Sequence, residues 1–199
     1  MSKKMLKRSL ALGALMAFVI TGQAWAEDNV VVNGGEEKSF VNKTIIFEQS
    51  APVNTWTNAV EVGNNATATF DGSATSITSS NIKEDNGYTA QGVYVKSGGS
   101  VYFNASETTI NVNSYFGVNG VTGDEGTAYF TGSEATVNVT VLGDGLGTSN
   151  AVGIKSGLDV ANSTNKFSVY VKGSGVDSTN PNSSNGTAGI YAANMPIKN

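Results

Sequence analysis

Beyond residue 26, apolar and polar positions alternate along short runs of the chain, and clusters of Gly, Asn, Ser and Thr separate these runs. The alternation is clearest in Val93-Tyr-Val95, Val101-Tyr-Phe103 and Ile110-Asn-Val112, where every second residue is apolar. A period of two is typical of β-strands with one buried face, and the polar clusters are typical of turns. The N-terminal segment apart, no window places apolar residues at helical spacing for more than one turn. The pattern therefore predicts an all-β fold of short strands.

One block of sequence recurs with fixed internal offsets. Its copies begin at Phe70, Phe103 and Phe130, and each carries Gly or Ala two residues later, Ser three residues later and Ile or Val seven residues later. Such a repeat indicates a solenoid, in which copies of one unit stack and bury a continuous apolar column. Val160 and Phe167 keep the same seven-residue step in a fourth unit. We expect the following residues to anchor the core: Phe70, Ile77, Phe103, Ile110, Phe130, Val137, Val160 and Phe167.

The openings of the units are also similar: Ala90-Gln-Gly92-Val93, Ala151-Val-Gly153-Ile154 and Ala188-Gly189-Ile190. We take Val60 and Val118 as the corresponding residues of the other two units. The spacings from Val60 through Val93, Val118 and Ile154 to Ile190 are then 33, 25, 36 and 36 residues. Preserved anchors with variable spacing indicate insertions at the turns of stacked strands. An antiparallel sandwich is the competing fold, but it does not predict repeats with fixed offsets. We therefore predict a parallel β-helix, or β-solenoid, over residues 58–199, with residues 27–57 as its N-terminal cap.

The first 26 residues follow a different pattern. Four basic residues within the first eight precede an apolar run from Leu10 to Ile20, and the segment ends in Ala24-Trp25-Ala26, the small-x-small pattern that signal peptidase reads. The 11-residue apolar run is too short for a membrane-spanning helix, which needs about 20 residues. We therefore predict a helical signal peptide over residues 1–26, cleaved after Ala26. The expected partners of this segment are the Sec export machinery and signal peptidase.

Composition restricts the possible chemistry. The chain has 12 Lys plus Arg against 16 Asp plus Glu, and loss of the predicted signal leaves 8 bases, none of them Arg, against 16 acids. An acidic chain without Arg is a poor candidate for binding nucleic acid. Without Cys or His, it has no disulfides, none of the usual zinc ligand sets and no Ser-His-Asp triad. No carboxylate pair stands out, so we predict no enzymatic activity, no catalytic residues, no cofactor and no metal site.

Two tyrosines are the surface residues that the pattern singles out. Tyr102 and Tyr129 each precede an anchor Phe and are therefore expected on the outer face of their strands. Exposed, stacked Tyr side chains can bind sugars through their apolar rings. Thr69 and Asp159 occupy the corresponding positions in the flanking units by this alignment. The ladder is then only two residues long, which favours ordinary surface positions over a binding site.

The chain resembles the N-terminal passenger region of a bacterial autotransporter, the type V secretion class. The resemblance rests on the signal, on the Cys-free repeats rich in Gly, Asn and Thr, and on the segment AQGVYVKSGGSVYF (Ala90 to Phe103). The resemblance implies a right-handed parallel β-helix that a C-terminal β-barrel translocator carries to the cell surface. The sequence has no closing set of amphipathic barrel strands and no terminal aromatic residue. We therefore expect a passenger fragment, truncated just after a further repeat opens at Thr187. The Gly-Asp-Ser-Gly motif of the family's serine proteases does not occur.

These observations favour an exported structural or adhesive module without catalytic activity, whose surface ligand is a glycan or a protein. The full-length protein is expected at the cell surface or outer membrane, and a chain that ends at Asn199 in the periplasm or the medium. The alternatives are a secreted β-solenoid carbohydrate-active enzyme, such as a lyase, and a short periplasmic structural solenoid. An ice-binding solenoid would need a regular outward Thr-x-Thr ladder, and Thr67-Ala-Thr69 is its one good rung.

Overall fold

The structure, a computed structural model, describes residues 19–21, 29–49, 57–81, 89–115, 117–142, 151–155, 158–172 and 187–190. The regular elements of these residues are all β-strands, and they form three parallel sheets. Sheet A is ordered β1 (Val19–Thr21), β3 (Glu37–Val41), β6 (Thr67–Asp71), β9 (Ser100–Phe103), β12 (Gly126–Phe130) and β15 (Leu158–Asn162). Sheet B is ordered β2 (Val30–Val32), β5 (Thr57–Val62), β8 (Thr89–Val95), β11 (Gly117–Gly123), β14 (Ala151–Ile154) and β17 (Thr187–Ile190). Sheet C is ordered β4 (Thr44–Gln49), β7 (Ala74–Asn81), β10 (Glu107–Ser114), β13 (Glu134–Val141) and β16 (Lys166–Lys172).

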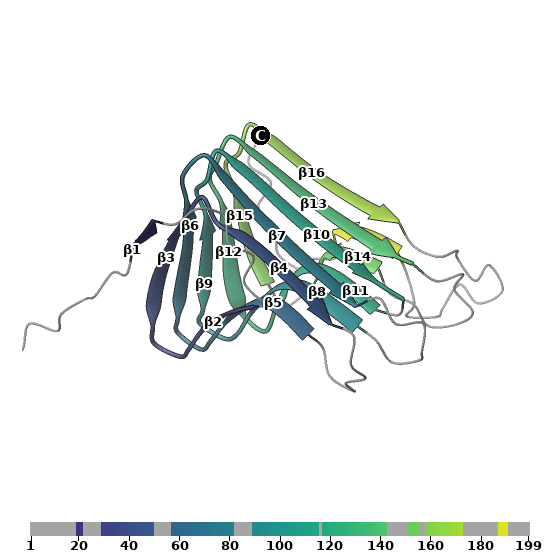
Figure 1. Cartoon of the computed structure of the whole chain (residues 1–199), viewed down its shortest axis with the longest axis horizontal. Coiled ribbons are helices and arrows are strands. Elements are labelled where there is room, and N and C mark those ends of the chain that lie inside the picture. Colours follow the sequence, from purple (N-terminus) through teal and green to yellow (C-terminus); the bar gives the residue numbers. More distant parts are fainter. Residues whose placement is uncertain are drawn as a thin grey trace, which may run out of the picture.

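The chain visits sheets B, A and C in turn, so that three consecutive strands make one coil (Figure 1). Equivalent strands of successive coils lie side by side and pair in parallel; Ile77 of β7, for example, pairs with Ile110 of β10. Period-two sequences favour this arrangement because strands such as β10 and β13 then bury every second side chain inside the coil. In sheet B, all seven residues of β11 are buried. The fold is a parallel β-solenoid, which confirms the all-β, stacked-repeat prediction.

The segment that the sequence predicts as a cap contains β2, β3 and β4. These strands pair in register with β5, β6 and β7 and place apolar side chains in the same columns, as in the pairing of Phe40 with Phe70. Polar residues occupy two inner positions of this coil. Gln49 is in register with the buried Asn81. Lys38 is in register with Ala68, and its Nζ lies 2.9 Å from the Val31 carbonyl oxygen and 3.1 Å from the Glu36 carboxylate. Residues 30–49 therefore make a stacked coil with a partly polar interior.

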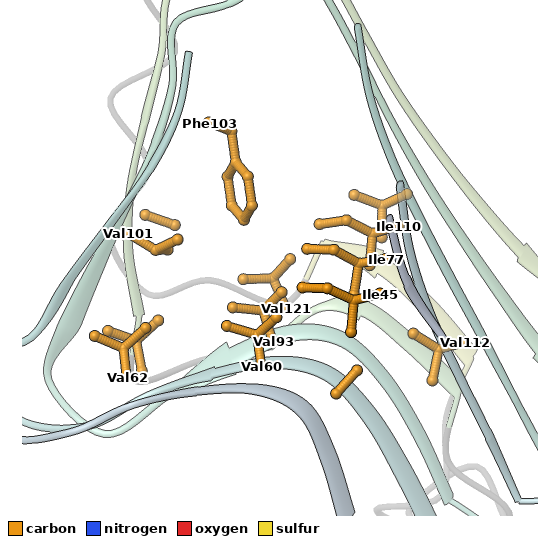
Figure 2. Packing of buried hydrophobic residues seen from close by; sticks show 14 of the residues in the cluster. Ile45, Val60, Val62, Ile77, Val93, Val101, Phe103, Ile110, Val112 and Val121 are labelled. Carbon is orange, nitrogen blue, oxygen red and sulfur yellow. The ribbon is translucent and has the colours of Figure 1, made fainter. Parts of the chain in front are cut away.

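Apolar columns run the length of the core. Figure 2 shows Ile45, Ile77 and Ile110 in one row, with Val60, Val93 and Val121 in another. A third column is aromatic: the rings of Phe40, Phe70, Phe103 and Phe130 stack on one another with centroid separations of 5.0, 5.6 and 4.8 Å. These side chains are buried, and each buried Phe or Ile contributes about 1.5–3 kcal/mol. Stacking identical residues thus turns a sequence repeat into one continuous core.

The register corrects two sequence alignments. Val93 pairs with Val121 and not with Val118, because Val118 pairs with Ala90. The spacing between these anchors is therefore 28 residues, not 25. Insertions concentrate at the corner from sheet C to sheet B, where the connection ranges from two residues, 115–116, to fourteen, 173–186. Val118 resembles an anchor in the sequence because it is apolar, but strand pairing shows that it corresponds to Ala90 and that Val121 is the anchor.

The second correction concerns the fourth repeat. Val160 pairs with Ala128, so Asn162 stands in the column that the phenylalanines occupy. Phe167 pairs with Ala135, and Val169 pairs with Val137. The Phe167 ring nevertheless meets Phe130 edge-on, with centroids 4.9 Å apart and ring planes at 64°. The aromatic column therefore continues with a ring contributed by sheet C in place of sheet A.

A column of small residues runs through sheet B. Ala59, Gly92, Gly120, Gly153 and Gly189 occupy equivalent positions in successive strands. A Cβ added at Gly120 would lie 2.4 Å from both the Gly153 carbonyl oxygen and Val137 Cγ1. The glycines of the repeated openings therefore let sheet B approach sheet C closely.

The corner between sheets B and A stacks residues of left-handed conformation. Gly35, Asn65, Gly98 and Glu125 have φ values of 75°, 54°, 69° and 56°. Their amides link the corners of neighbouring coils, as in the hydrogen bond of 3.2 Å from Gly98 N–H to the Glu125 carbonyl oxygen. Gly and Asn adopt this conformation readily. The Gly- and Asn-rich turns of the sequence are therefore the corners of the solenoid.

Three residues of the predicted helical signal form a strand instead. Val19–Thr21 makes β1, which pairs in parallel with Ser39–Val41 at the edge of sheet A. An edge strand offers unpaired backbone N–H and C=O groups that an extended segment can satisfy. The predicted cleavage residues, Ala24 and Ala26, lie outside the described residues. Within the part of the chain that the structure describes, no helix is long and apolar enough to cross a membrane.

Candidate functional site

The outer face of sheet C carries mostly polar side chains, together with the exposed Ile46 and Tyr170. One rung across the sheet is formed entirely by hydroxyl residues in register: Thr44, Ser76, Thr109, Thr136 and Ser168. Along each strand, these outward-facing positions alternate with buried residues such as Ile77 and Val137. The row of hydroxyl residues therefore follows directly from the period-two sequence. This face presents hydrogen-bonding groups at the spacing of neighbouring strands, about 4.8 Å.

A second rung carries amides and an aromatic ring. Asn111 of β10, Asn138 of β13 and Tyr170 of β16 stand in register. Asn138 Nδ2 donates a hydrogen bond of 2.9 Å to Asn111 Oδ1. Tyr170 is 62% exposed, the most exposed of the large hydrophobic side chains that the structure describes. The rung therefore combines fixed amide groups with an accessible ring.

These residues line an open pocket on the outer face. Its polar lining comes from β7, β10, β13 and β16 and includes Asn111, Asn113, Asn138, Thr140, Tyr170 and Lys172. Among the residues that the structure describes, no Asp or Glu lines the pocket, and Lys172 is the one charged lining residue. Among the described residues, Lys172 has no carboxylate within ion-pair distance. The pocket can therefore offer amide and hydroxyl groups, one ring and one ammonium group to a ligand.

The charges around the pocket are arranged along strands β13 and β16. Lys166, at the start of β16, forms an ion pair with Glu134 of β13, which raises the pKa of Lys166. Lys172 lies at the other end of β16, beside Thr140. The two lysines of this strand therefore differ: one is paired outside the pocket, and the other lines it.

The tyrosine pair is on the outer face of sheet A. The rings of Tyr102 and Tyr129 stack face to face, with centroids 4.4 Å apart and ring planes at 5°. Partial burial and the neighbouring Tyr129 raise the pKa of Tyr102. Thr69 flanks the pair on one side and Ala161, not Asp159, flanks it on the other. The two rings cover one another, so each offers one face to a ligand.

The structure buries six of the eight expected anchors completely or almost so: Phe70, Ile77, Phe103, Ile110, Phe130 and Val137. Phe167 is partly buried and packs against the same core. The backbone of Val160 lies in β15, and its side chain lies outside the described part of the structure. The anchors thus support the sheets and take no part in the pocket.

The described part of the chain contains no group of three or more His, Cys, Asp or Glu side chains placed to hold a metal ion. Asp71, Asn104 and Thr131 form a polar cluster at the corner between sheets A and C. In it, Asn104 Nδ2 donates a hydrogen bond of 3.0 Å to Asp71 Oδ1, and the Thr131 hydroxyl donates one to Asn104 Oδ1. These groups satisfy one another, so they serve to join coils.

Sequence reasoning missed the pocket residues. Asn111, Asn138 and Tyr170 each directly follow an anchor of sheet C: Ile110, Val137 and Val169. Taking Phe167 as the anchor of the last coil displaced Tyr170 from this column. An alignment on the recurrent Asn-Val and Tyr-Val pairs would have brought the three residues together.

Comparison of the chain with protein-family models, with curated proteins and with solved structures gives no match. The site must therefore be interpreted from its own chemistry.

Proposed function

We propose that this chain is an exported, non-catalytic surface module of the autotransporter passenger kind, which adheres to ligands through the outer face of sheet C. The proposal includes the right-handed coil that the resemblance to passenger regions implies. Its export is supported by the basic and apolar pattern of residues 1–20 and by Ala24-Trp25-Ala26. Its stacked coils are suited to presenting a rigid, extended face.

The observation that carries the adhesive role is the mostly polar outer face of sheet C with its open pocket. Side chains on this face do not support the core, and the pocket places amides, hydroxyls, a ring and an ammonium group together. A rigid face of this type loses little conformational entropy when it binds, which favours adhesion through many weak contacts.

The proposal is tested on cells that express the gene from its own locus, with whatever follows Asn199 in frame. We expect the mature N-terminus at Glu27 by intact mass, and digestion of the protein by protease added to whole cells. Beads coated with the purified chain should then bind to cells that lack the gene. A protein that keeps Met1 and fractionates with the cytoplasm would contradict the proposal.

A further inference from the structure

We infer that the pocket on sheet C binds a sugar residue that carries a carboxylate, as a unit of an acidic polysaccharide. The inference rests on the proposed function and deepens it, because it names the site and the ligand class. It follows from three features of the described residues: unused amide groups, an exposed ring and a single unpaired cation.

The amides provide a matched donor and acceptor. The hydrogen bond from Asn138 Nδ2 to Asn111 Oδ1 fixes both side chains. It leaves Asn111 Nδ2 as a donor and Asn138 Oδ1 as an acceptor, neither with a hydrogen bond to another described residue. The two groups belong to adjacent strands and flank the hydrogen bond that joins the amides, so they point away from one another. Different hydroxyls of a sugar, each a donor and an acceptor, can bond to the two groups separately.

The ring supplies an apolar surface beside these amides. Tyr170 is in register with Asn138 and lies on β16, the last strand of sheet C in the described residues. In that part of the chain its ring stacks on no other aromatic ring. The apolar C–H face of a sugar ring can pack on it while the hydroxyls reach the amides.

The charge selects an acidic sugar over a neutral one. Lys172 follows Tyr170 by two residues on the same strand and face, so the two side chains lie about 7 Å apart along the strand. The acid on the same rung, Glu48, is four strands away. A single ammonium group beside neutral amides suits one carboxylate per sugar unit, whereas phosphate-rich polymers need clustered cations.

The test uses the purified chain in calorimetric titrations at low salt. The probes are a trimer of galacturonic acid, a dimer of sialic acid, the neutral trimer of galactose and a polyglutamate peptide. We expect saturable binding of at least one acidic sugar, and affinity that falls as salt is added. Tyr170→Ala and Lys172→Gln should each weaken binding by about tenfold or more.

Two matched variants serve as controls. Lys166→Gln removes a lysine of the same strand that is paired outside the pocket, and Tyr129→Ala removes an aromatic ring from sheet A. Both should keep the affinity of the unmodified chain, and thermal unfolding should show that all four variants fold.

Four results would overturn the inference: no binding of either acidic sugar, equal affinity for the galactose trimer, equal affinity for polyglutamate, or unchanged binding in both pocket variants. Each of them leaves the export and surface exposure of the protein intact, since those are measured on cells. Conversely, a cytoplasmic protein would contradict the proposed function even if the purified chain bound the sugar.

Discussion

The backbone of Gly120 lies so close to Gly153 that a Cβ added at Gly120 would meet the Gly153 carbonyl oxygen at 2.4 Å. The same Cβ would lie 2.4 Å from Val137 Cγ1 of sheet C. Two sheets and two coils therefore converge on this one glycine, and its lack of a side chain sets the distance between sheets B and C.

Gly120→Ala is therefore expected to destabilise the fold by about 1–3 kcal/mol, the usual cost of overpacking. Gly189→Ala is the matched control, because Gly189 occupies the same column but a Cβ there meets nothing within 4 Å. Urea unfolding of both variants measures the difference. Equal stability of the two would show that the sheets can separate without cost.

Phe103 lies in the middle of the aromatic column, between Phe70 and Phe130. Phe103→Ala should lower the free energy of unfolding by about 3–5 kcal/mol, because a large cavity opens in a fully packed core. The neighbouring Tyr102→Ala removes an outer ring that stacks on Tyr129 and should cost about 0.5–1.5 kcal/mol. The ordering of the two variants in chemical denaturation checks the assignment of inner and outer faces.

Glu125 holds a left-handed conformation, with φ of 56°, at the corner where other coils have Gly or Asn. Glu125→Gly should stabilise the fold by up to about 1 kcal/mol, since the relief of strain exceeds the added freedom of the unfolded chain. The substitution also removes an exposed hydrogen bond of 3.2 Å from Ser97 Oγ to the Glu125 carboxylate, and this loss reduces the expected stabilisation only slightly. The measurement is the shift of the thermal midpoint.

Gly98→Ala is the opposite case at the same corner. Its φ is 69°, and an added Cβ would lie 2.3 Å from Asn65 Oδ1. This variant should be less stable than the unmodified chain. A destabilised Glu125→Gly together with a neutral Gly98→Ala would contradict the corner assignment.

Tyr94 donates a hydrogen bond to the Asp124 carboxylate, which with partial burial raises its pKa to about 12 from the ordinary 10.0. Because the folded-state pKa is raised, this bond stabilises the fold fully below pH 10, and its contribution is lost as the pH rises to about 12. Ultraviolet titration of tyrosinate should show a group that ionises with a pKa of about 12. Asp124→Asn should return that group towards 10.0, and a titration unchanged by this substitution would be inconsistent with the bond.

The pocket was harder to predict than the core. The anchors recur as Phe, Ile and Val at fixed offsets, because any coil must bury apolar residues at those points. Asn111, Asn138 and Tyr170 share no residue type across all three coils, and only the pairing of β10, β13 and β16 places them on one rung. Their common feature is a position directly after an anchor, and the pairing of Val169 with Val137 establishes it for Tyr170.

The sequence by itself determined that the chain is all-β, that its units stack, and that Phe70, Phe103 and Phe130 share one column, because a period of two and a repeated block each have a direct structural meaning. The tertiary structure decided the register of Val121 and of the last coil, and the close contact at the glycine column. It also decided the grouping of amides, ring and ammonium on sheet C. These features depend on which strands lie side by side, and turn insertions of variable length conceal that pairing in the linear sequence.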